Sequence, residues 1–189
     1  MRKPLLILVS GAPGAGKTTL AHKLAEYLRV PHIARDEVLR GLEMTLGRET
    51  DRKEQVSKLY YPLLVHMLKA EMSVVTDGTI SRDLSEDDIK TFLVPNAQVV
   101  NIHARAANEH QRFIDRETQR EGWSNDWVDA HLKHLDTIYP RTVEPLDLGI
   151  PLIEVDTTNG YAPSIPEVVS RIRKMYKDTR TGVQEGGER

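Results

Sequence analysis

Residues 11–18 narrow the choice of folds for this 189-residue chain more than any other stretch. They read Gly11, Ala12, Pro13, Gly14, Ala15, Gly16, Lys17 and Thr18, which fits the pattern G-x-x-x-x-G-K-[ST] in full. A continuous apolar run at residues 5–9 precedes them, and residues 18–29 follow with leucines at helical spacing. Glycine lets the backbone wind around a phosphate with its N–H groups turned inward, and the helix that follows adds the positive end of its dipole. The sequence therefore predicts a strand, a phosphate-binding loop and a helix in direct succession.

The remainder of the chain alternates between strand-like and helix-like segments. Apolar runs typical of buried strands occupy residues 5–9, 31–34, 73–77, 98–103 and 151–155. Helical patterns occupy residues 18–29, 36–46, 50–72, 81–93, 106–120 and 165–176, with a further polar helix ending near 139. This alternation predicts an α/β protein of the P-loop NTPase fold: a five-stranded parallel sheet with helices on both faces and ligands at the carboxyl ends of the strands. We expect one domain over residues 1–178, with a helical lid at about 106–128 and a polar, disordered tail at 179–189.

The composition is that of a soluble globular protein. Charged residues make up 29% of the chain and hydrophobic residues 39%, and the formal net charge is only −2. No global charge therefore recruits nucleic acid or an anionic membrane, and a nucleic-acid site would need a local basic patch. No apolar run approaches the roughly 20 residues that span a bilayer. There is no cysteine, and the seven histidines lack the spacing of a metal site. We expect a cytoplasmic protein without a membrane partner.

The phosphate-binding loop predicts a nucleoside triphosphate, ATP or GTP, held together with Mg²⁺. In this motif the lysine reaches the β- and γ-phosphates, and the next hydroxyl completes the coordination of Mg²⁺. The chain lacks the Asn/Thr-Lys-x-Asp pattern of a guanine reader, and Asp77 is followed by Gly78 rather than by a second acid. These absences favour a small kinase over a GTPase or a motor ATPase. We expect nucleotide contacts from Gly11, Ala12, Pro13, Gly14, Ala15, Gly16, Lys17, Thr18, Thr19, Arg112 and Thr157.

Three segments together resemble known kinases. Besides residues 11–18 they read Ile33-Ala34-Arg35-Asp36-Glu37-Val38-Leu39-Arg40 and Val74-Val75-Thr76-Asp77-Gly78-Thr79. Over most of residues 4–178 the chain resembles the kinase domain of polynucleotide kinase and its small-molecule relatives, the zeta-toxin-like and chloramphenicol-phosphotransferase-like enzymes. The resemblance implies that Asp36 is the general base that takes the proton from an acceptor hydroxyl.

The two acids also have ordinary structural interpretations. A hydroxyl that attacks phosphorus must lose its proton, which a carboxylate within hydrogen-bond reach can accept; Asp36 could equally cap the helix at 36–46. Asp77 ends a buried-type strand, where it could hold a Mg²⁺-bound water, orient the acceptor, or cap a loop. The predicted metal ligands are thus Thr18 and Asp77. The predicted acceptor-binding residues are Arg35, Asp36, Asp77, Thr79 and Arg82.

Arginines recur at four-residue spacing in the predicted lid. Arg112, Arg116 and Arg120 fall on one side of the helix at 106–120, where nearby acids would make a salt-bridged surface. The resemblance offers a second interpretation, a lid R-x-x-x-R pair formed by Arg112 and Arg116 that closes over the triphosphate. The resemblance thus implies that Arg112 and Arg116 are catalytic, together with Lys17 and Asp36. Of the two arginines, we expect Arg116 to matter more for catalysis. Trp123 and Trp127 follow in the sequence. Their rings could stack on a ring of the acceptor, or they could pack against the next helix and anchor it.

The leading hypothesis is a phosphotransferase that moves the γ-phosphoryl group to a hydroxyl of a nucleoside, a sugar or an antibiotic. A 5′-hydroxyl polynucleotide kinase is the alternative, but the basic residues near Asp36 alternate with acids, as in Arg35-Asp36-Glu37, which favours a small acceptor. A nucleotide-binding switch or ATPase is a third hypothesis, in which Asp36 would be dispensable. The sequence does not indicate the oligomeric state.

Overall fold

A computed structural model describes residues 3–46, 56–82, 85–119, 133 and 139–176. The described strands form one sheet, and all of its pairings are parallel. Its order is β2-β3-β1-β4-β5. The strands are β1 (Leu5–Ser10), β2 (His32–Ala34), β3 (Val74–Asp77), β4 (Gln98–Arg105) and β5 (Leu152–Asp156). The five-stranded parallel sheet predicted from the apolar runs is thereby confirmed.

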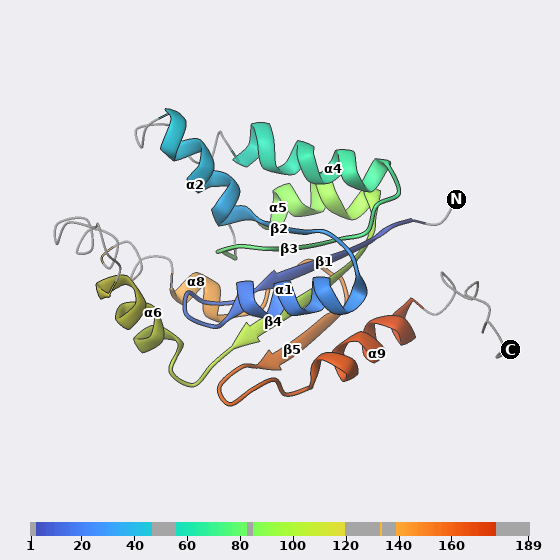
Figure 1. The fold of residues 1–189 in the computed structure, drawn as a ribbon. Coiled ribbons are helices and arrows are strands. Elements are labelled where there is room, and N and C mark those ends of the chain that lie inside the picture. The colour runs from blue at the N-terminus through green and yellow to red at the C-terminus, as the bar shows by residue number, and fades with distance from the viewer. Residues whose placement is uncertain (1–2, 47–55, 83–84, 120–132, 134–138, 177–189) are drawn as a thin grey trace, which may run out of the picture.

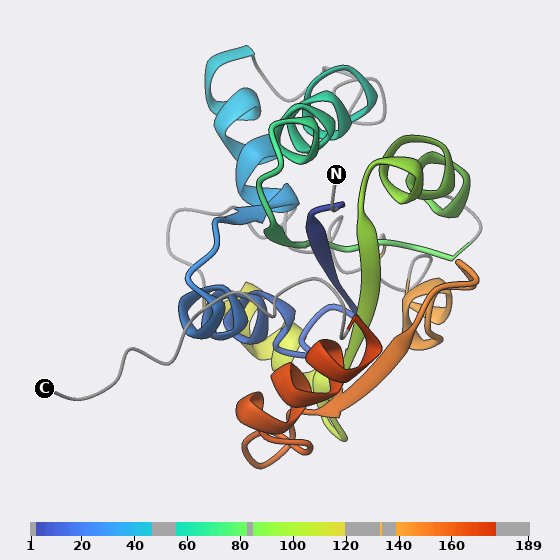
Figure 2. The same ribbon diagram turned by 90° about the vertical axis from the view of Figure 1, so that its right-hand side faces the viewer.

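Helices cover both faces of this sheet, as the two ribbon views show (Figures 1 and 2). The α-helices are α1 (Lys17–Leu28), α2 (Arg35–Leu46), α4 (Tyr61–Lys69), α5 (Glu86–Asp88), α6 (Glu109–Thr118), α8 (Pro140–Val143) and α9 (Ile165–Met175). The described residues also form the π-helical turns η1 (Val56–Tyr60) and η2 (Ile89–Leu93) and the 3₁₀ turn η3 (Val94–Asn96). Helices α1 and α9 lie on one face, and α2, α4 and α5 lie on the other (Figure 2). Among the described helices, none is long and apolar enough to cross a membrane.

The continuous apolar run of β1 serves two hydrophobic cores at once. Leu6 and Leu8 belong to the core under α2 and α4, while Ile7 and Val9 belong to the core under α1 and α9. Successive side chains of a strand point to opposite faces of the sheet. A strand that is covered on both faces therefore has apolar side chains at successive positions. This alternation explains why the sequence reads as an unbroken apolar segment.

Several helix boundaries differ from the expected ones. The helix expected at 81–93 begins only at Glu86 and continues as η2, and Ser85 makes no side-chain capping bond. Pro62 lies in the first turn of α4, directly after the π-helical turn η1. The helix expected from 106 begins at Glu109, and the short helix α8 has no counterpart among the expected elements. Most of the expected polar helix ending near 139 and the predicted tail lie outside the described residues.

Candidate active site

The phosphate-binding loop joins β1 to α1 at the carboxyl edge of the sheet. The backbone of Gly11 has a φ of +136°, and an added Cβ would lie 2.1 Å from the Ala104 carbonyl oxygen. Gly14 has a φ of +87°, and its Cβ would lie 1.8 Å from the Glu109 carbonyl oxygen. Any side chain at either position would displace the neighbouring backbone. The loop is therefore wedged between the end of β4 and the start of α6.

Lys17 begins α1 and is buried beside this loop. Its Nζ donates a hydrogen bond to the Ala12 carbonyl oxygen at 2.8 Å. Burial lowers the pKa of the Lys17 ammonium from 10.5 to about 8, against the opposing effects of the Asp36 and Asp77 carboxylates. Arg116 lowers the same pKa further. The four side chains predicted from distant parts of the sequence therefore lie within electrostatic range of one another.

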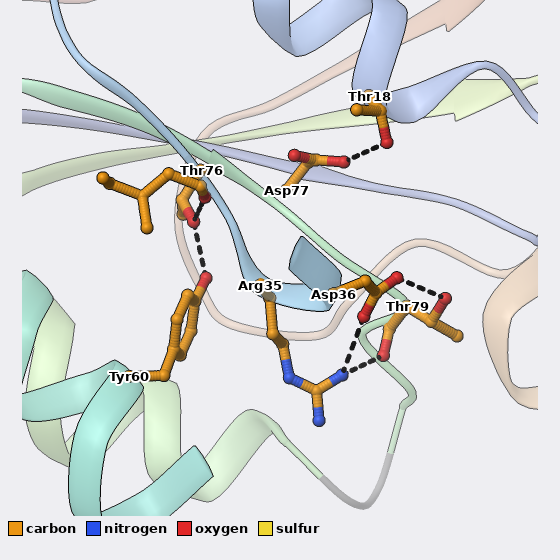
Figure 3. Close-up of polar contacts among 8 residues, drawn as sticks. Thr18, Arg35, Asp36, Tyr60, Thr76, Asp77 and Thr79 are labelled. Atoms are coloured by element: carbon orange, nitrogen blue, oxygen red, sulfur yellow. Dashed lines mark hydrogen bonds and ion pairs between the residues drawn. The ribbon is translucent and has the colours of Figure 1, made fainter. Parts of the chain in front are cut away.

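Thr18 and Asp77 form the predicted metal-binding pair. The Thr18 hydroxyl donates to Oδ2 of Asp77 at 2.7 Å, as Figure 3 shows. The register of the sheet places Asp77 of β3 opposite Val9 of β1, one residue before β1 ends and the phosphate-binding loop begins. A hydroxyl whose proton is given to a carboxylate keeps its lone pairs for a cation, and both groups offer the hard oxygen ligands that Mg²⁺ prefers. The pair thus fits a Mg²⁺ ion that is shared with nucleotide phosphates.

Asp77 has a second partner that the sequence did not indicate. Oδ1 of Asp77 lies 2.6 Å from Nε2 of His32, on the neighbouring strand β2. We assigned no histidine to the site from the sequence, because the pairing depends on the register of β2 against β3. That register places Ala34 opposite Asp77 and His32 opposite Val75. No linear motif encodes it.

Asp36 lies in the first turn of α2, just after β2. One interpretation of the sequence made Asp36 the cap of this helix. The helix begins at Arg35, however, so Asp36 lies within its first turn. Its carboxylate is 53% exposed, and its polar contacts with described residues are long: 3.5 Å from Oγ1 of Thr79 and 3.9 Å from Nη1 of Arg35. An exposed carboxylate in this position is available to an incoming group.

Arg35 is held in place by the loop after β3. Its Nη1 donates to the Thr79 carbonyl oxygen at 2.8 Å. The side chain crosses Gly78 so closely that a Cβ there would lie 2.8 Å from the Cβ of Arg35. Figure 3 shows Arg35, Asp36 and Thr79 together, apart from the Thr18–Asp77 pair. The backbone N–H of Arg82 bonds to the Arg141 carbonyl oxygen, which ties the same loop to α8.

The two described lid arginines lie on α6 and have different partners. Arg112 donates to the carbonyl oxygens of Thr157 (3.3 Å) and Thr158 (2.8 Å), in the loop after β5. Arg116 is largely exposed; its Nε donates to Glu117 at 3.0 Å and its guanidinium lies over the Phe113 ring. Arg116 therefore has an acidic partner, but Glu117 is buried, at 1% exposed, rather than part of a solvated surface. Arg120, Trp123 and Trp127 lie outside the described residues.

The loop after β5 supports the phosphate-binding loop directly. The Thr157 hydroxyl donates to the Ala15 carbonyl oxygen at 2.9 Å, and the Cβ of Gly16 would lie 3.3 Å from that hydroxyl. Thr157, an expected nucleotide contact, thus connects the loop after β5 to the phosphate-binding loop. Thr19 lies exposed in the first turn of α1.

Several buried polar groups behind the phosphate-binding loop were also not predicted from the sequence. The Ser10 hydroxyl lies 3.1 Å from Nδ1 of His103, whose Nε2 bonds to the Val143 carbonyl oxygen at 2.9 Å. Burial lowers the pKa of His103. Glu109 accepts from the Ala106 N–H and from the Tyr139 hydroxyl, and so anchors the start of α6. These links join elements far apart in the sequence, and local spacing carries no signal for them.

Comparison with protein families matches residues 6–145 to an AAA domain family. The match spans more than half of the chain and includes the phosphate-binding loop, Asp36 and Asp77. The chain belongs to this AAA domain family. Its five-stranded parallel sheet and phosphate-binding loop are those of a P-loop kinase fold, and the P-loop fold predicted from the sequence is confirmed.

Several proteins that are similar to this chain carry kinase names. A Pyrococcus abyssi protein named "Putative adenylate kinase" is 28% identical over 97% of this chain and 92% of its own length. A Halobacterium salinarum protein named "Cytidylate kinase" is 36% identical over 91% of this chain and 100% of its own length. The structure of a "putative kinase" from Chloroflexus aurantiacus superposes with a TM-score of 0.71 at 25% identity, over 94% of this chain and 98% of that one. The chain is accordingly a P-loop kinase, a phosphotransferase. The narrower resemblance to polynucleotide kinase and zeta toxin stays a prediction.

Proposed function

We propose that this kinase transfers the γ-phosphoryl group of ATP or GTP to a hydroxyl group of a small molecule, with Asp36 as the general base. The observation that carries the proposal is the state of the Asp36 carboxylate. It is half exposed, its contacts with described residues are 3.5 Å and 3.9 Å long, and its charge raises the pKa of buried Lys17. A base for phosphoryl transfer needs this combination: freedom to accept a proton and nearness to the lysine that binds the phosphates.

The other residues supply binding and charge. The N–H groups of the loop and the Lys17 ammonium would hold the β- and γ-phosphates. Thr18 and Asp77 would hold Mg²⁺, which supplies neutralisation of phosphate charge when bound. The acceptor oxygen then forms a bond to the γ-phosphorus as the bond from phosphorus to the β–γ bridging oxygen breaks. The nucleoside diphosphate leaves, and the hydroxyl proton passes to Asp36.

The lid arginines have separate tasks in this proposal. Arg112 is already bound to the backbone of the loop after β5, so it would shape the nucleotide site. The exposed guanidinium of Arg116 acts on the charge of Lys17 and would stabilise the charge on the transferring group. The acceptor would lie between Asp36, Arg35 and Thr79, with Arg82 on the same loop as Thr79.

A nucleoside monophosphate is the second candidate acceptor, and the names of the relatives favour it. The chemistry separates the two candidates. A phosphate oxygen that is already ionised carries no proton for Asp36 to remove, and the negative charge of Asp36 would repel it. The arrangement at Asp36 therefore favours a hydroxyl. A polynucleotide 5′-hydroxyl remains the alternative acceptor from the sequence.

The experiment is transfer of radiolabelled γ-phosphate, from ATP and from GTP, to a panel of acceptors. The panel contains nucleosides, sugars, nucleoside-type antibiotics, a 5′-hydroxyl oligonucleotide and nucleoside monophosphates. We expect label on one small hydroxyl acceptor, and loss of that label in the Asp36→Asn variant. Label on monophosphates alone, retained in Asp36→Asn, would replace the hydroxyl proposal with a nucleotide kinase. Phosphate release alone, equal in both proteins, would favour the switch or ATPase hypothesis.

A further inference from the structure

The contact between His32 and Asp77 is short and partly buried, and the function proposed so far does not use it. Nε2 of His32 lies 2.6 Å from Oδ1 of Asp77, and the two side chains are 15% and 3% exposed. Oδ2 of the same carboxylate accepts from the Thr18 hydroxyl at 2.7 Å. Each oxygen of Asp77 thus has its own partner, one from the edge strand β2 and one from helix α1.

The chemistry of the groups sets the direction of the bond to His32. An ionised carboxylate only accepts hydrogen bonds, so a bond to Oδ1 requires the proton on Nε2 of His32. Bonds to a charged acceptor are shorter and stronger than neutral ones, which agrees with the 2.6 Å separation. A carboxylate held by donors on both oxygens cannot rotate about its Cβ–Cγ bond without breaking one of them.

We propose that His32 is a positioning residue for the Mg²⁺ site. By holding Oδ1, it keeps Oδ2 of Asp77 directed at Thr18, so that the Thr18 hydroxyl gives its proton to Asp77 and presents its lone pairs to the cation. Partners of this kind behind a metal-binding side chain fix its orientation. The inference rests on the proposed Mg²⁺–nucleotide function and adds a residue from β2 to that site.

The position of β2 gives this contact a structural consequence. The strand is short, His32–Ala34, and it lies at the edge of the sheet, paired only with β3 among the described strands. Asp36 follows it directly in α2. His32 therefore links the segment that carries the proposed base to the carboxylate of the metal site by a side-chain bond, in addition to the backbone pairing.

The test measures metal binding rather than turnover. Mn²⁺ serves as the probe for Mg²⁺, and its Kd for the enzyme–ADP complex is obtained from the electron paramagnetic resonance signal of free Mn²⁺. We expect His32→Leu, which removes the donor, to weaken Mn²⁺ binding by about 10- to 100-fold. The Kd for ADP measured in EDTA should stay at the wild-type value, because the phosphate cradle does not contact His32.

Two further variants separate positioning from packing. Glutamine places an amide N–H near the position of Nε2, so His32→Gln should restore most of the Mn²⁺ affinity. Asparagine is shorter and its amide cannot reach Asp77, so His32→Asn should also weaken Mn²⁺ binding by about 10- to 100-fold. It supplies the test if the leucine variant does not fold. His22 is the matched control, an exposed histidine on α1 whose ring centre lies 6.2 Å from that of His32. The His22→Leu variant should bind Mn²⁺ like the wild type.

The possible outcomes distinguish a failure of the proposed role of His32 from a failure of the proposed Mg²⁺–nucleotide function. Unchanged Mn²⁺ affinity in both His32→Leu and His32→Asn would overturn the positioning role. So would a glutamine variant as weak as the asparagine one, or a parallel loss of ADP binding in EDTA. A wild-type enzyme–ADP complex that holds no Mn²⁺ would instead contradict the proposed Mg²⁺–nucleotide function itself.

Discussion

Nucleotide binding should weaken as the pH rises through about 8, because that is where the free protein loses the charge of Lys17. Burial holds the pKa of this ammonium at about 8, well below its usual 10.5. Triphosphate binds the charged form of the lysine. Its negative charge favours that form, so in the complex the pKa returns to at least its ordinary range. Above pH 8 the free protein must therefore take up a proton in order to bind, and the affinity falls.

The size of the effect follows from the shift. With a pKa of about 8 in the free protein, the Kd scales as one plus ten raised to the difference between the pH and this pKa. Between about pH 7 and about pH 9 this is roughly a tenfold rise in Kd, or about 1.4 kcal/mol. A lysine with its usual pKa would change the Kd by only about 3% over the same interval.

Calorimetric titration of ATP in EDTA across this interval measures the effect without a metal ion. The Lys17→Arg variant should show a flat profile, since a guanidinium stays charged. The control is Lys23→Arg, an exposed lysine on the same helix, which should follow the wild type. A wild-type Kd that does not change between these pH values would refute the reasoning, and so would an equal decline in Lys17→Arg.

Three further substitutions test other parts of the site. Arg116→Ala should lower kcat by on the order of 10³-fold with little change in the Kd for ATP, and an effect on the Kd alone would remove its transition-state role. Gly14→Ala should abolish ATP binding in calorimetry, because its Cβ would lie 1.8 Å from the Glu109 carbonyl oxygen; wild-type affinity would contradict this geometry. Thr157→Val leaves the buried Ala15 carbonyl oxygen without the Thr157 hydroxyl and should destabilise the fold by about 1–3 kcal/mol in denaturant unfolding, together with weaker ATP binding.

The sheet and the cradle could be predicted from the sequence because their signals are local. A strand buried on both faces reads as an unbroken apolar run, as at residues 5–9. Gly11 and Gly14 of the loop lie where a side chain would collide with neighbouring backbone. Lys17 and Thr18 follow from the same motif. The alternation of strands and helices also predicts that Asp36 and Asp77 lie at the carboxyl edge of a parallel sheet. The strand order β2-β3-β1-β4-β5, which the sequence did not predict, brings them near the loop.

Contacts that depend on register or on long-range packing could not be predicted. The hydrogen bond between His32 and Asp77 requires β2 to pair with β3 in one register. The hydrogen bond from Arg112 to Thr157 joins residues that are 45 positions apart in the sequence. The expected helix at 81–93 begins late, at Glu86, whose Oε1 accepts the backbone N–H of Asp147 from a distant loop. Such tertiary contacts override local helical spacing, which is why the boundaries differ while the fold agrees.

The role of Asp36 is tested most directly by the rate of phosphoryl transfer to the acceptor found in the panel, in wild type and in Asp36→Asn. Asparagine keeps the shape of the side chain but cannot accept the proton. We predict a fall in kcat of about 10²- to 10⁴-fold, with the Kd for ATP unchanged. Equal transfer rates in the two proteins would contradict the proposed mechanism and point to an acceptor whose attacking oxygen carries no proton.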